Sequence, residues 1–248
     1  MATAPAAVSS SAPLESLIHS SLREDLLRAA ADPALTEDLV LALLKRADLP
    51  SEVLEQLAKN GSALKQRKTK LALATHPHAP RHVSVPLIRQ FYTFDLMRVA
   101  LRPGVPTDVK IVADDALISR LKTVTIGERL TLARQGSGRV AGALLLDAEA
   151  RVMRAALENS RLSEALVIQA ILKPQAKAAL VQAVSRHAKW SLRREVRIAL
   201  LRTEYLSLAR ALEFGRGLPL PLLREVMLSS RLPERVKKQL LRNGLDKS

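Results

Sequence analysis

The apolar residues of this chain recur in short clusters with helical spacing. One helical face carries Leu14, Leu17, Ile18 and Leu22, which follow one another at intervals of one to four residues. Residues 166–172, with the sequence LVIQAIL, leave almost no polar face. A helix that is apolar on all sides is buried between neighbours. The pattern therefore predicts an all-α protein built from short helices, some of them sandwiched between others.

A six-residue segment with a recurring pattern separates the clusters, and we call it a joint. Its clearest copy, residues 159–164, reads NSRLSE: three variable residues, an apolar residue, then Ser, Thr or Pro, often followed by Glu. Other copies, some of them looser, lie at residues 32–37, 46–51, 76–81, 187–192 and 229–234. A Ser or Thr hydroxyl accepts a free N–H of the first helical turn, Pro fits the first helical position, and the apolar residue packs on that turn. Each joint therefore predicts a helix start.

The joints are regularly spaced. Their fifth residues fall at positions 36, 50, 80 and 106, and again at 163, 177, 191, 207, 219 and 233. Most intervals are about 14 residues or twice that, the length of one or two short helices with their turns at ~1.5 Å per residue. A pair of such helices gives a period of about 28 residues, within the range of solenoid repeats. We therefore predict an α-solenoid, a superhelix of short stacked helices.

The spacing also divides the chain. We predict a single helical-repeat domain over residues 14–244, with N-terminal repeats at 14–106, an irregular middle at 107–162 and regular C-terminal repeats at 163–244. Residues 1–13 are rich in Ala, Ser and Pro and lack the features of a secretory signal, so we expect a disordered tail and a cytoplasmic protein. Residues 245–248 are expected to form a short C-terminal tail.

Two stretches resemble units of the leucine-rich repeat variant family, which is related to HEAT repeats. They are residues 70–80 (KLALATHPHAP) and 151–164 (RVMRAALENSRLSE), and the resemblance extends in broken form over residues 26–243. It implies a right-handed superhelix that acts as a binding scaffold. One member of that family carries an iron–sulfur module, which does not transfer because this chain has no cysteine. A HEAT-like group of DNA glycosylases is also basic and helical, but its site pairs an Asp with Trp residues, whereas Trp190 has no Asp nearby in sequence and takes the apolar position of its joint.

The composition restricts the chemistry that the chain can perform. Without cysteine there is no disulfide, no thiol nucleophile and no cysteine-ligated metal. Aromatic residues make up only 2% of the sequence, which suits thin layers of Ala, Leu and Val better than one large core. No apolar run approaches the ~20 residues of a membrane helix, so we expect no membrane insertion.

Two motifs that could bind a ligand fit structural roles better. A metal site at His76, His78 and His82 would need a fourth ligand on the same face, and the first two lie in a joint, so we prefer a turn role. Residues 136–142 (GSGRVAG) match no phosphate-binding motif, and we expect a helix–helix turn whose small residues allow close packing.

Two further clusters are also assigned to structure. Asp114 and Asp115 are adjacent, and adjacent helical residues point about 100° apart, so they do not form a pair for acid–base catalysis. The aromatic cluster Phe91, Tyr92 and Phe94 is expected in the core rather than as a platform for nucleic-acid bases. We predict no catalytic residue, no cofactor and no metal.

The net charge of +15 is unevenly distributed. Residues 1–60 carry 5 basic and 9 acidic side chains, whereas residues 61–248 carry 34 and 15. A basic body favours acidic partners, either a protein or nucleic acid. We interpret the basic run at residues 65–70 as a solvated helix surface. The predicted partner-binding residues are Arg186, Lys189, Arg193, Arg194, Arg197, Arg202, Arg235 and Lys238.

These observations lead to three hypotheses about function. The first is a non-enzymatic scaffold that binds an acidic protein through an Arg-rich face. The second is a nucleic-acid-binding protein of the HEAT-like type, whose affinity would fall steeply with salt. The third, an enzyme similar to the repair glycosylases, would also need a carboxylate facing the basic surface.

Overall fold

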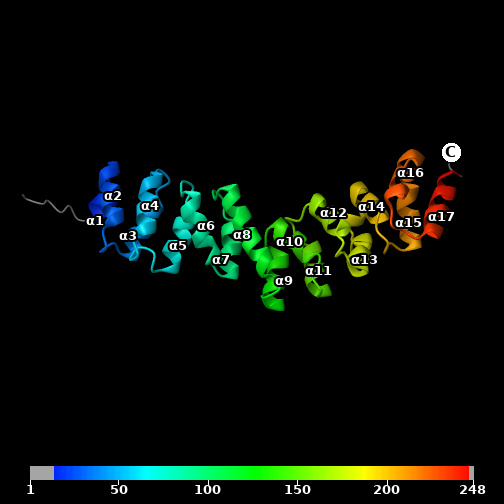
Figure 1. Ribbon diagram of the computed structural model, residues 1–248, viewed down its shortest axis with the longest axis horizontal. Coiled ribbons are helices and arrows are strands. Elements are labelled where there is room, and N and C mark those ends of the chain that lie inside the picture. Colours follow the sequence, from blue (N-terminus) through cyan, green and yellow to red (C-terminus); the bar gives the residue numbers. More distant parts are fainter. Residues whose placement is uncertain (1–13, 246–248) are drawn as a thin grey trace, which may run out of the picture. The chain divides into compact units, whose positions relative to one another are not determined.

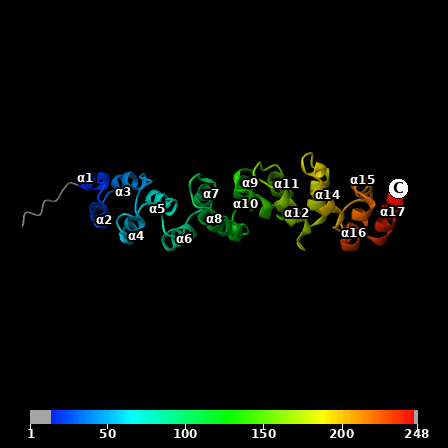
Figure 2. The same cartoon turned by 90° about the horizontal axis from the view of Figure 1, so that it is seen from above.

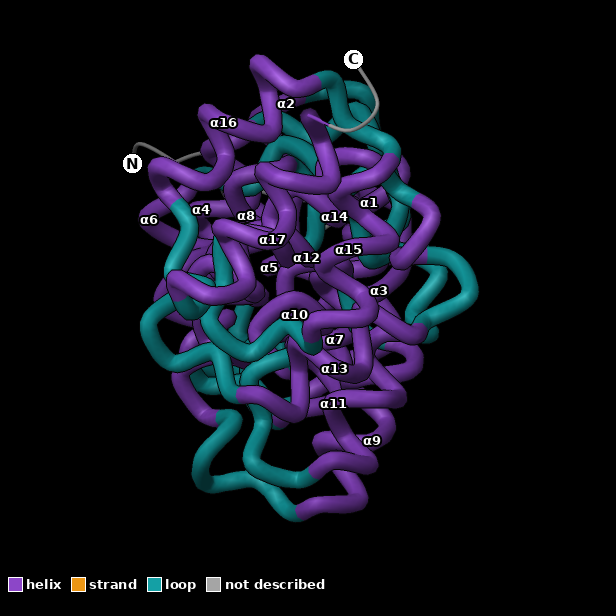
Figure 3. Tube along the Cα trace, turned by 90° about the vertical axis from the view of Figure 1, so that its right-hand side faces the viewer, coloured by secondary structure: helices purple, strands orange, loops and turns teal. Residues whose placement is uncertain are grey.

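The computed structural model describes residues 14–245, and all regular structure in them is helical. They form seventeen α-helices and one 3-10 helix, and no strand occurs within this range (Figures 1 and 3). The predicted all-α class is confirmed. The expected tails lie outside the described residues, except that Leu245 is the last residue of α17.

The chain divides into two compact units, Met1–Ala116 and Leu117–Ser248. The first unit contains seven helices: α1 (Leu14–His19), α2 (Arg23–Ala31), α3 (Glu37–Leu44), α4 (Ser51–Lys59), α5 (Arg67–Ala74), α6 (Arg81–Arg89) and α7 (Thr93–Leu101). The long helix α8 (Thr107–Arg120) begins in the first unit and ends in the second.

The second unit continues with short helices. They are α9 (Ile126–Gln135), α10 (Gly138–Leu144), α11 (Ala150–Leu157), α12 (Glu164–Leu172), α13 (Ala178–Arg186), the 3-10 helix η1 (Trp190–Leu192), α14 (Arg194–Leu201), α15 (Leu208–Arg216), α16 (Leu220–Ser229) and α17 (Glu234–Leu245).

Within each unit, helices pack against the helix two places away along the chain as well as against their immediate neighbours. In the first unit α2 packs on α4, and α3 packs on both α1 and α5. In the second unit α11 lies between α9 and α13, while α12 and α14 continue a second row that starts at α10 and ends at α16 (Figure 2). This arrangement buries helices such as α14 on two sides, with Val196, Ile198, Ala199, Leu200 and Leu201 all buried. The apolar helices of the sequence are therefore interior helices.

The apolar residue is buried in most joints that have leucine at this position before a Ser, Thr or Pro cap, whereas Ala79 is partly exposed. Leu35, Leu49, Leu162 and Leu232 are each at most 4% exposed. Ser163 caps α12 as expected, because its hydroxyl accepts the N–H of Leu166. The prolines differ from the expectation by one residue: Pro50, Pro80 and Pro219 occupy the cap position, and the helix begins at the next residue. In that position Pro still supplies a fixed φ near −60° to the chain that enters the helix.

The joint at residues 187–192 departs from the pattern. Its apolar residue Trp190 is 1% exposed, and its indole N–H donates to the carbonyl oxygen of Leu157 at 3.0 Å. The predicted helix start at Ser191 is wrong, because residues 190–192 form η1 and Arg193 is the cap of α14. The extra turn accommodates the large indole beneath the joint.

Residues 107–162 contain one unusually long helix and three short ones. Helix α8 has 14 residues, and the caps Thr125, Ser137 and Glu149 then start α9, α10 and α11. Those caps are 12 residues apart, which is close to the spacing of the joints elsewhere. The departure from regular spacing in this region is therefore concentrated in α8.

The glycines at residues 136–142 allow close packing, as the sequence indicates. A Cβ atom on Gly138 would overlap the carbonyl oxygen of Arg161, and a Cβ atom on Gly142 would lie 3.3 Å from Leu166. Helix α10 can therefore lie directly against the joint that precedes α12. The stretch forms a turn and a helix of 7 residues.

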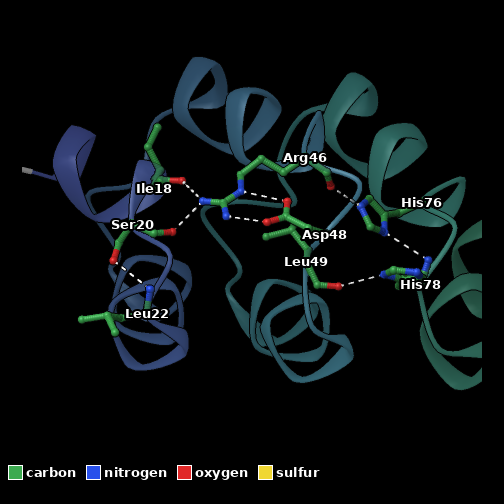
Figure 4. Close-up of polar contacts among 8 residues, drawn as sticks. All are labelled: Ile18, Ser20, Leu22, Arg46, Asp48, Leu49, His76 and His78. Carbon is green, nitrogen blue, oxygen red and sulfur yellow. Dashed lines mark hydrogen bonds and ion pairs between the residues drawn. The ribbon is translucent and has the colours of Figure 1, made fainter.

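Side chains in and near the joints reach carbonyl oxygens at the end of a helix about one helix pair earlier. The Arg46 guanidinium donates to the carbonyl oxygens of Ile18 at 2.9 Å and Ser20 at 2.7 Å, and Asp48 holds it through two further hydrogen bonds (Figure 4). His76 Nε2 then donates to the carbonyl oxygen of Arg46 at 2.8 Å. Asn60, Asn159 and Ser230 form equivalent bonds: their side chains donate to carbonyl oxygens 23 to 30 residues earlier in sequence. These bonds satisfy carbonyl groups that a helix end leaves without a partner.

The two joint histidines have the turn role that was preferred for them. His76 Nδ1 accepts the main-chain N–H of His78 at 3.2 Å, and His78 Nδ1 donates to the carbonyl oxygen of Leu49 at 3.1 Å (Figure 4). His76 therefore uses one ring nitrogen as donor and the other as acceptor, which only the neutral ring can do. Burial lowers the pKa of His76 and so favours this neutral form.

Two expectations about the first unit need correction or refinement. Phe91 is buried, but Tyr92 is 72% exposed and Phe94 40% exposed, so the aromatic cluster is not a core cluster. Tyr92 caps α7, and the Arg67 guanidinium lies over its ring at 5.5 Å. Arg67, from the basic run at residues 65–70, also forms two hydrogen bonds to the buried carboxylate of Asp95. It therefore ties α5 to α7 rather than standing free in solvent.

Candidate functional site

All eight predicted partner-binding residues lie in the second unit, but they do not gather in one place. Arg186 ends α13, Lys189 follows it, and Arg193 and Arg194 begin α14, all of them exposed. Arg202 caps the other end of α14, and its carbonyl oxygen accepts the N–H of Arg231 just before α17. Arg235 and Lys238 on α17 therefore belong to the end of α14 that is opposite to Arg193, about 12 Å away for a helix of 8 residues.

Two of the eight side chains, those of Arg197 and Lys189, also make contacts inside the second unit. Arg197 is half-buried, donates through Nε to the carbonyl oxygen of Ser191 at 2.6 Å, and lies over the Phe214 ring at 5.2 Å. Lys189 lies over the indole of Trp190 at 4.1 Å. Arg202 is half-buried at the end of α14. Arg197 in particular holds η1 in place, which reduces its freedom to contact a partner.

A groove lined by four arginines lies on the outer face of α11 and α13. Its volume is about 690 Å³, within the range of ~300–1,000 Å³ typical of ligand sites. Its charged rim is formed by Arg134, Arg151, Arg154 and Arg186, and we call it the arginine groove. The floor consists largely of small or apolar side chains: Ala150, Ala155, Ala179, Ala183 and Met153. Only Arg186 belongs to the residues predicted from sequence.

Helix α11 places its arginines by simple amphipathic geometry. Val152, Met153, Ala156 and Leu157 are buried, so the opposite face of the helix points to solvent. On that face Arg151 and Arg154 are three residues apart and therefore adjacent on the helix surface. The floor is low because alanine side chains end at Cβ, which leaves space above the helices.

Hydrogen bonds hold the ends of the three helices together beneath this rim. Asn159 Nδ2 donates to the carbonyl oxygens of Ala133 at 2.8 Å and Gly136 at 3.2 Å, which joins the end of α11 to the end of α9. The Trp190 bond to Leu157 joins the turn after α13 to the end of α11. These bonds fix the relative positions of Arg134 on α9, Glu158 at the end of α11 and Arg186 on α13.

The electrostatics of the groove are strongly one-sided. Among the described residues, none of the four arginines forms an ion pair within 4.0 Å. Glu158 is the only carboxylate among the lining residues, and His187 Nε2 lies 3.1 Å from its Oε1. The groove therefore carries uncompensated positive charge around a single carboxylate.

A pattern in the sequence indicates two of the four groove arginines, although the cluster of basic residues at 186–202 is more conspicuous. Arg134, Glu158 and Arg186 each come nine residues after the cap of their helix, which is Thr125, Glu149 and Lys177. Equivalent positions in packed helices lie side by side, so a row of charge crosses α9, α11 and α13. The row becomes visible only after the helices are numbered from their caps.

The other candidates for chemistry do not form a site. Asp114 is buried and Asp115 is exposed, so the two carboxylates point in different directions. In residues 14–245 no group of three or more His, Asp or Glu side chains could hold a metal ion. Over the same residues, no helix has the length and apolar character that crossing a membrane requires.

Comparison with known proteins gives no assignment: no family model matches the chain, and no curated protein or solved structure is significantly similar to it. Any statement of function therefore depends on the residues and geometry described above.

Proposed function

We propose that the protein is a non-enzymatic helical-repeat scaffold of the α-solenoid type, related in architecture to HEAT repeats and the leucine-rich repeat variant. Two features support this proposal. Helices within each unit pack on the helix two places away, and side chains such as Arg46, His76 and Asn159 bond to carbonyl groups about one helix pair earlier in the chain. Both features are expected when a two-helix repeat is stacked on its neighbour.

The scaffold binds an acidic protein through the Arg-rich surface of its second unit. The observation that supports this most directly is the charge of that unit: residues 117–248 contain 25 Lys and Arg but 11 Asp and Glu, a net charge of +14 out of the total of +15. Like charges in such excess repel one another and destabilise the compact state, whereas they attract partners of the opposite charge.

An acidic protein is favoured over nucleic acid by the nature of the exposed basic surface. The floor of the arginine groove is aliphatic, and Tyr, Phe and Trp are absent from its lining. Proteins that bind single-stranded nucleic acid usually stack its bases on aromatic side chains. Binding to the duplex backbone, the second hypothesis, needs only basic charge and is therefore kept as an outcome of the test.

The test is a binding titration by fluorescence anisotropy with labelled poly-L-glutamate and with labelled duplex DNA, at about 50 and about 200 mM salt. We expect saturable binding of poly-L-glutamate that weakens at higher salt. Reversing three exposed charges together, Arg186→Glu, Arg193→Glu and Arg194→Glu, should reduce the affinity about tenfold or more, because each reversal removes an attraction of about 0.2–1 kcal/mol and adds a repulsion of similar size.

Two results would decide against the proposal. Tight binding of duplex DNA with a log–log salt slope of about −0.9 per phosphate contact, without binding of poly-L-glutamate, would support the nucleic-acid hypothesis instead. If neither probe binds even at the lower salt concentration, the acidic-partner function is refuted.

A further inference from the structure

We infer that the arginine groove holds a linear acidic segment of the partner, and that Glu158 weakens the binding of that segment by lowering the positive potential of the groove. The inference rests on the proposed function, since it specifies what part of an acidic protein is bound and where. It depends on three features of the groove: its size, its unpaired arginines and the position of its single carboxylate.

The size and shape of the groove suit a segment rather than a folded surface. Helix α11 has 8 residues, so the groove extends for about 12 Å along it. About four residues of an extended chain cover that length at ~3.3 Å per residue. The alanine floor can accept the main chain and aliphatic stems of such a segment, while a convex folded surface would contact only the rim.

The arginines are arranged to receive carboxylates that arrive from outside. Arg151 and Arg154 stand on one face of α11, Arg186 projects from α13 and Arg134 from α9, and none of them is engaged in an ion pair within the described residues. A guanidinium group binds a carboxylate through two parallel hydrogen bonds, a geometry that lysine does not offer. The groove lining contains four arginines and no lysine.

Glu158 occupies the position where a ligand carboxylate would be favoured. It lies in the row between Arg134 and Arg186, one turn after Arg154, and its side chain is 76% exposed. His187, whose side chain is only 12% exposed, holds it at one oxygen atom. A carboxylate at this place lowers the positive potential of the groove, so its removal should strengthen binding of an acidic segment.

The experiment measures the affinity of a short labelled oligoglutamate peptide for the full chain and its variants. Arg154→Glu should weaken binding about tenfold, since it replaces an attraction of up to about 1 kcal/mol by a repulsion of similar size. The matched control is Arg216→Glu at the end of α15, which is exposed and basic in the last helical turn but does not line the groove. It should change the affinity less than about threefold.

Glu158→Gln provides a test in the opposite direction. It should tighten binding about two- to fivefold, whereas Glu225→Gln, an exposed control on α16, should leave the affinity within about twofold of the wild type. Both changes remove the same charge, so a difference between them reports position rather than net charge. Far-ultraviolet circular dichroism melts of each variant establish that the fold is retained.

The outcomes separate this inference from the proposed function. If the peptide binds but Arg154→Glu and Glu158→Gln behave like their controls, while the Arg193→Glu and Arg194→Glu pair abolishes binding, the groove inference is wrong and the proposed function stands. If the wild type binds no acidic peptide at all, both fail. If duplex DNA competes at the groove more strongly than the peptide, the segment is not the preferred ligand and the inference is overturned.

Discussion

Asn159 connects the ends of α9 and α11, and its replacement should reveal how much a joint bond contributes to stability. The residue is 2% exposed, its Nδ2 donates to two carbonyl oxygens, and its Oδ1 accepts the N–H of Arg161 at 2.8 Å. Asn159→Ala removes all three hydrogen bonds and leaves their partners without compensation. An unsatisfied buried polar group costs about 1–3 kcal/mol, and partial access of water to the joint reduces the sum. We expect a loss of about 2–4 kcal/mol.

Asn159→Asp has nearly the same shape and should cost more. The carboxylate loses both donors and faces the carbonyl oxygens of Ala133 and Gly136, so that attraction becomes repulsion in a buried site. The expected order of stability is wild type, then Asn159→Ala, then Asn159→Asp. Ser160→Ala, at the exposed neighbouring residue, is the control and should change stability by less than about 0.5 kcal/mol.

Urea unfolding followed by circular dichroism measures these differences. With a slope of about 2 kcal/mol per M, a loss of 3 kcal/mol lowers the midpoint by about 1.5 M. The reasoning is refuted if Asn159→Asp is as stable as Asn159→Ala, because the order depends only on the donor role of Nδ2. A loss below about 0.5 kcal/mol for Asn159→Ala would contradict the role of the joint bonds in holding the helices together.

Three further predictions test other parts of the structure. Leu162→Asp should lower the free energy of unfolding by about 3 kcal/mol or more, because it buries a charge at a position that is 3% exposed, whereas Leu192→Asp, at 70% exposure, should have little effect. Arg67→Ala should cost about 2 kcal/mol, because it removes two hydrogen bonds from the buried carboxylate of Asp95; Arg98→Ala, whose guanidinium lies 4.0 Å from the same carboxylate, should cost much less in the same assay. Burial lowers the pKa of His76 in the native state, so as the pH falls the ring is protonated in the unfolded chain before it is protonated in the folded one. The contribution of His76 to stability should therefore be complete above about pH 6.5 and decrease below it, until the native ring is protonated too. His76→Gln should remove this part of the pH dependence and His82→Gln, at an exposed histidine, should not; equal slopes for both variants would contradict the assignment.

The helix starts could be predicted from the sequence because each depends on neighbouring residues. A buried leucine before a Ser or Pro cap, as at Leu162 and Leu49, is a local signal that the structure repeats many times. The starts at Gln66 and Tyr92 were not predicted, because neither cap is Ser, Thr or Pro. Neither residue forms a side-chain cap bond.

The bonds between joints could not be predicted, since chemically different side chains serve one purpose. Arg46, His76, Asn159 and Ser230 all bond to carbonyls about one helix pair earlier, yet they share no residue type. A sequence pattern detects a repeated residue, whereas this role requires only a donor that reaches an unpaired carbonyl. For the same reason the histidines of residues 76 and 78 resembled metal ligands until their partners were known.

The arginine groove was missed for a different reason, because its residues come from three separate helices. Arg134, Arg154 and Arg186 are 20 and 32 residues apart, and only the packing of α9 and α13 on either side of α11 brings them together. The cluster at residues 186–202 was more conspicuous in the sequence. The structure distributes that cluster over both ends of α14 and directs the half-buried Arg197 toward Phe214.

At the ends of α11 and α13, a residue that lines the groove is followed directly by a residue that is buried or mostly covered. Glu158 is exposed and lines the groove, while the next residue, Asn159, is buried and bonds to α9. Arg186 is exposed, while the next residue, His187, is mostly covered. The charge at Glu158 or Arg186 can therefore be changed while the hydrogen bonds of Asn159 to α9 are retained. It follows that Arg154→Glu and Glu158→Gln should alter affinity at nearly constant stability, and that Asn159→Ala should alter stability while every charge of the groove is retained.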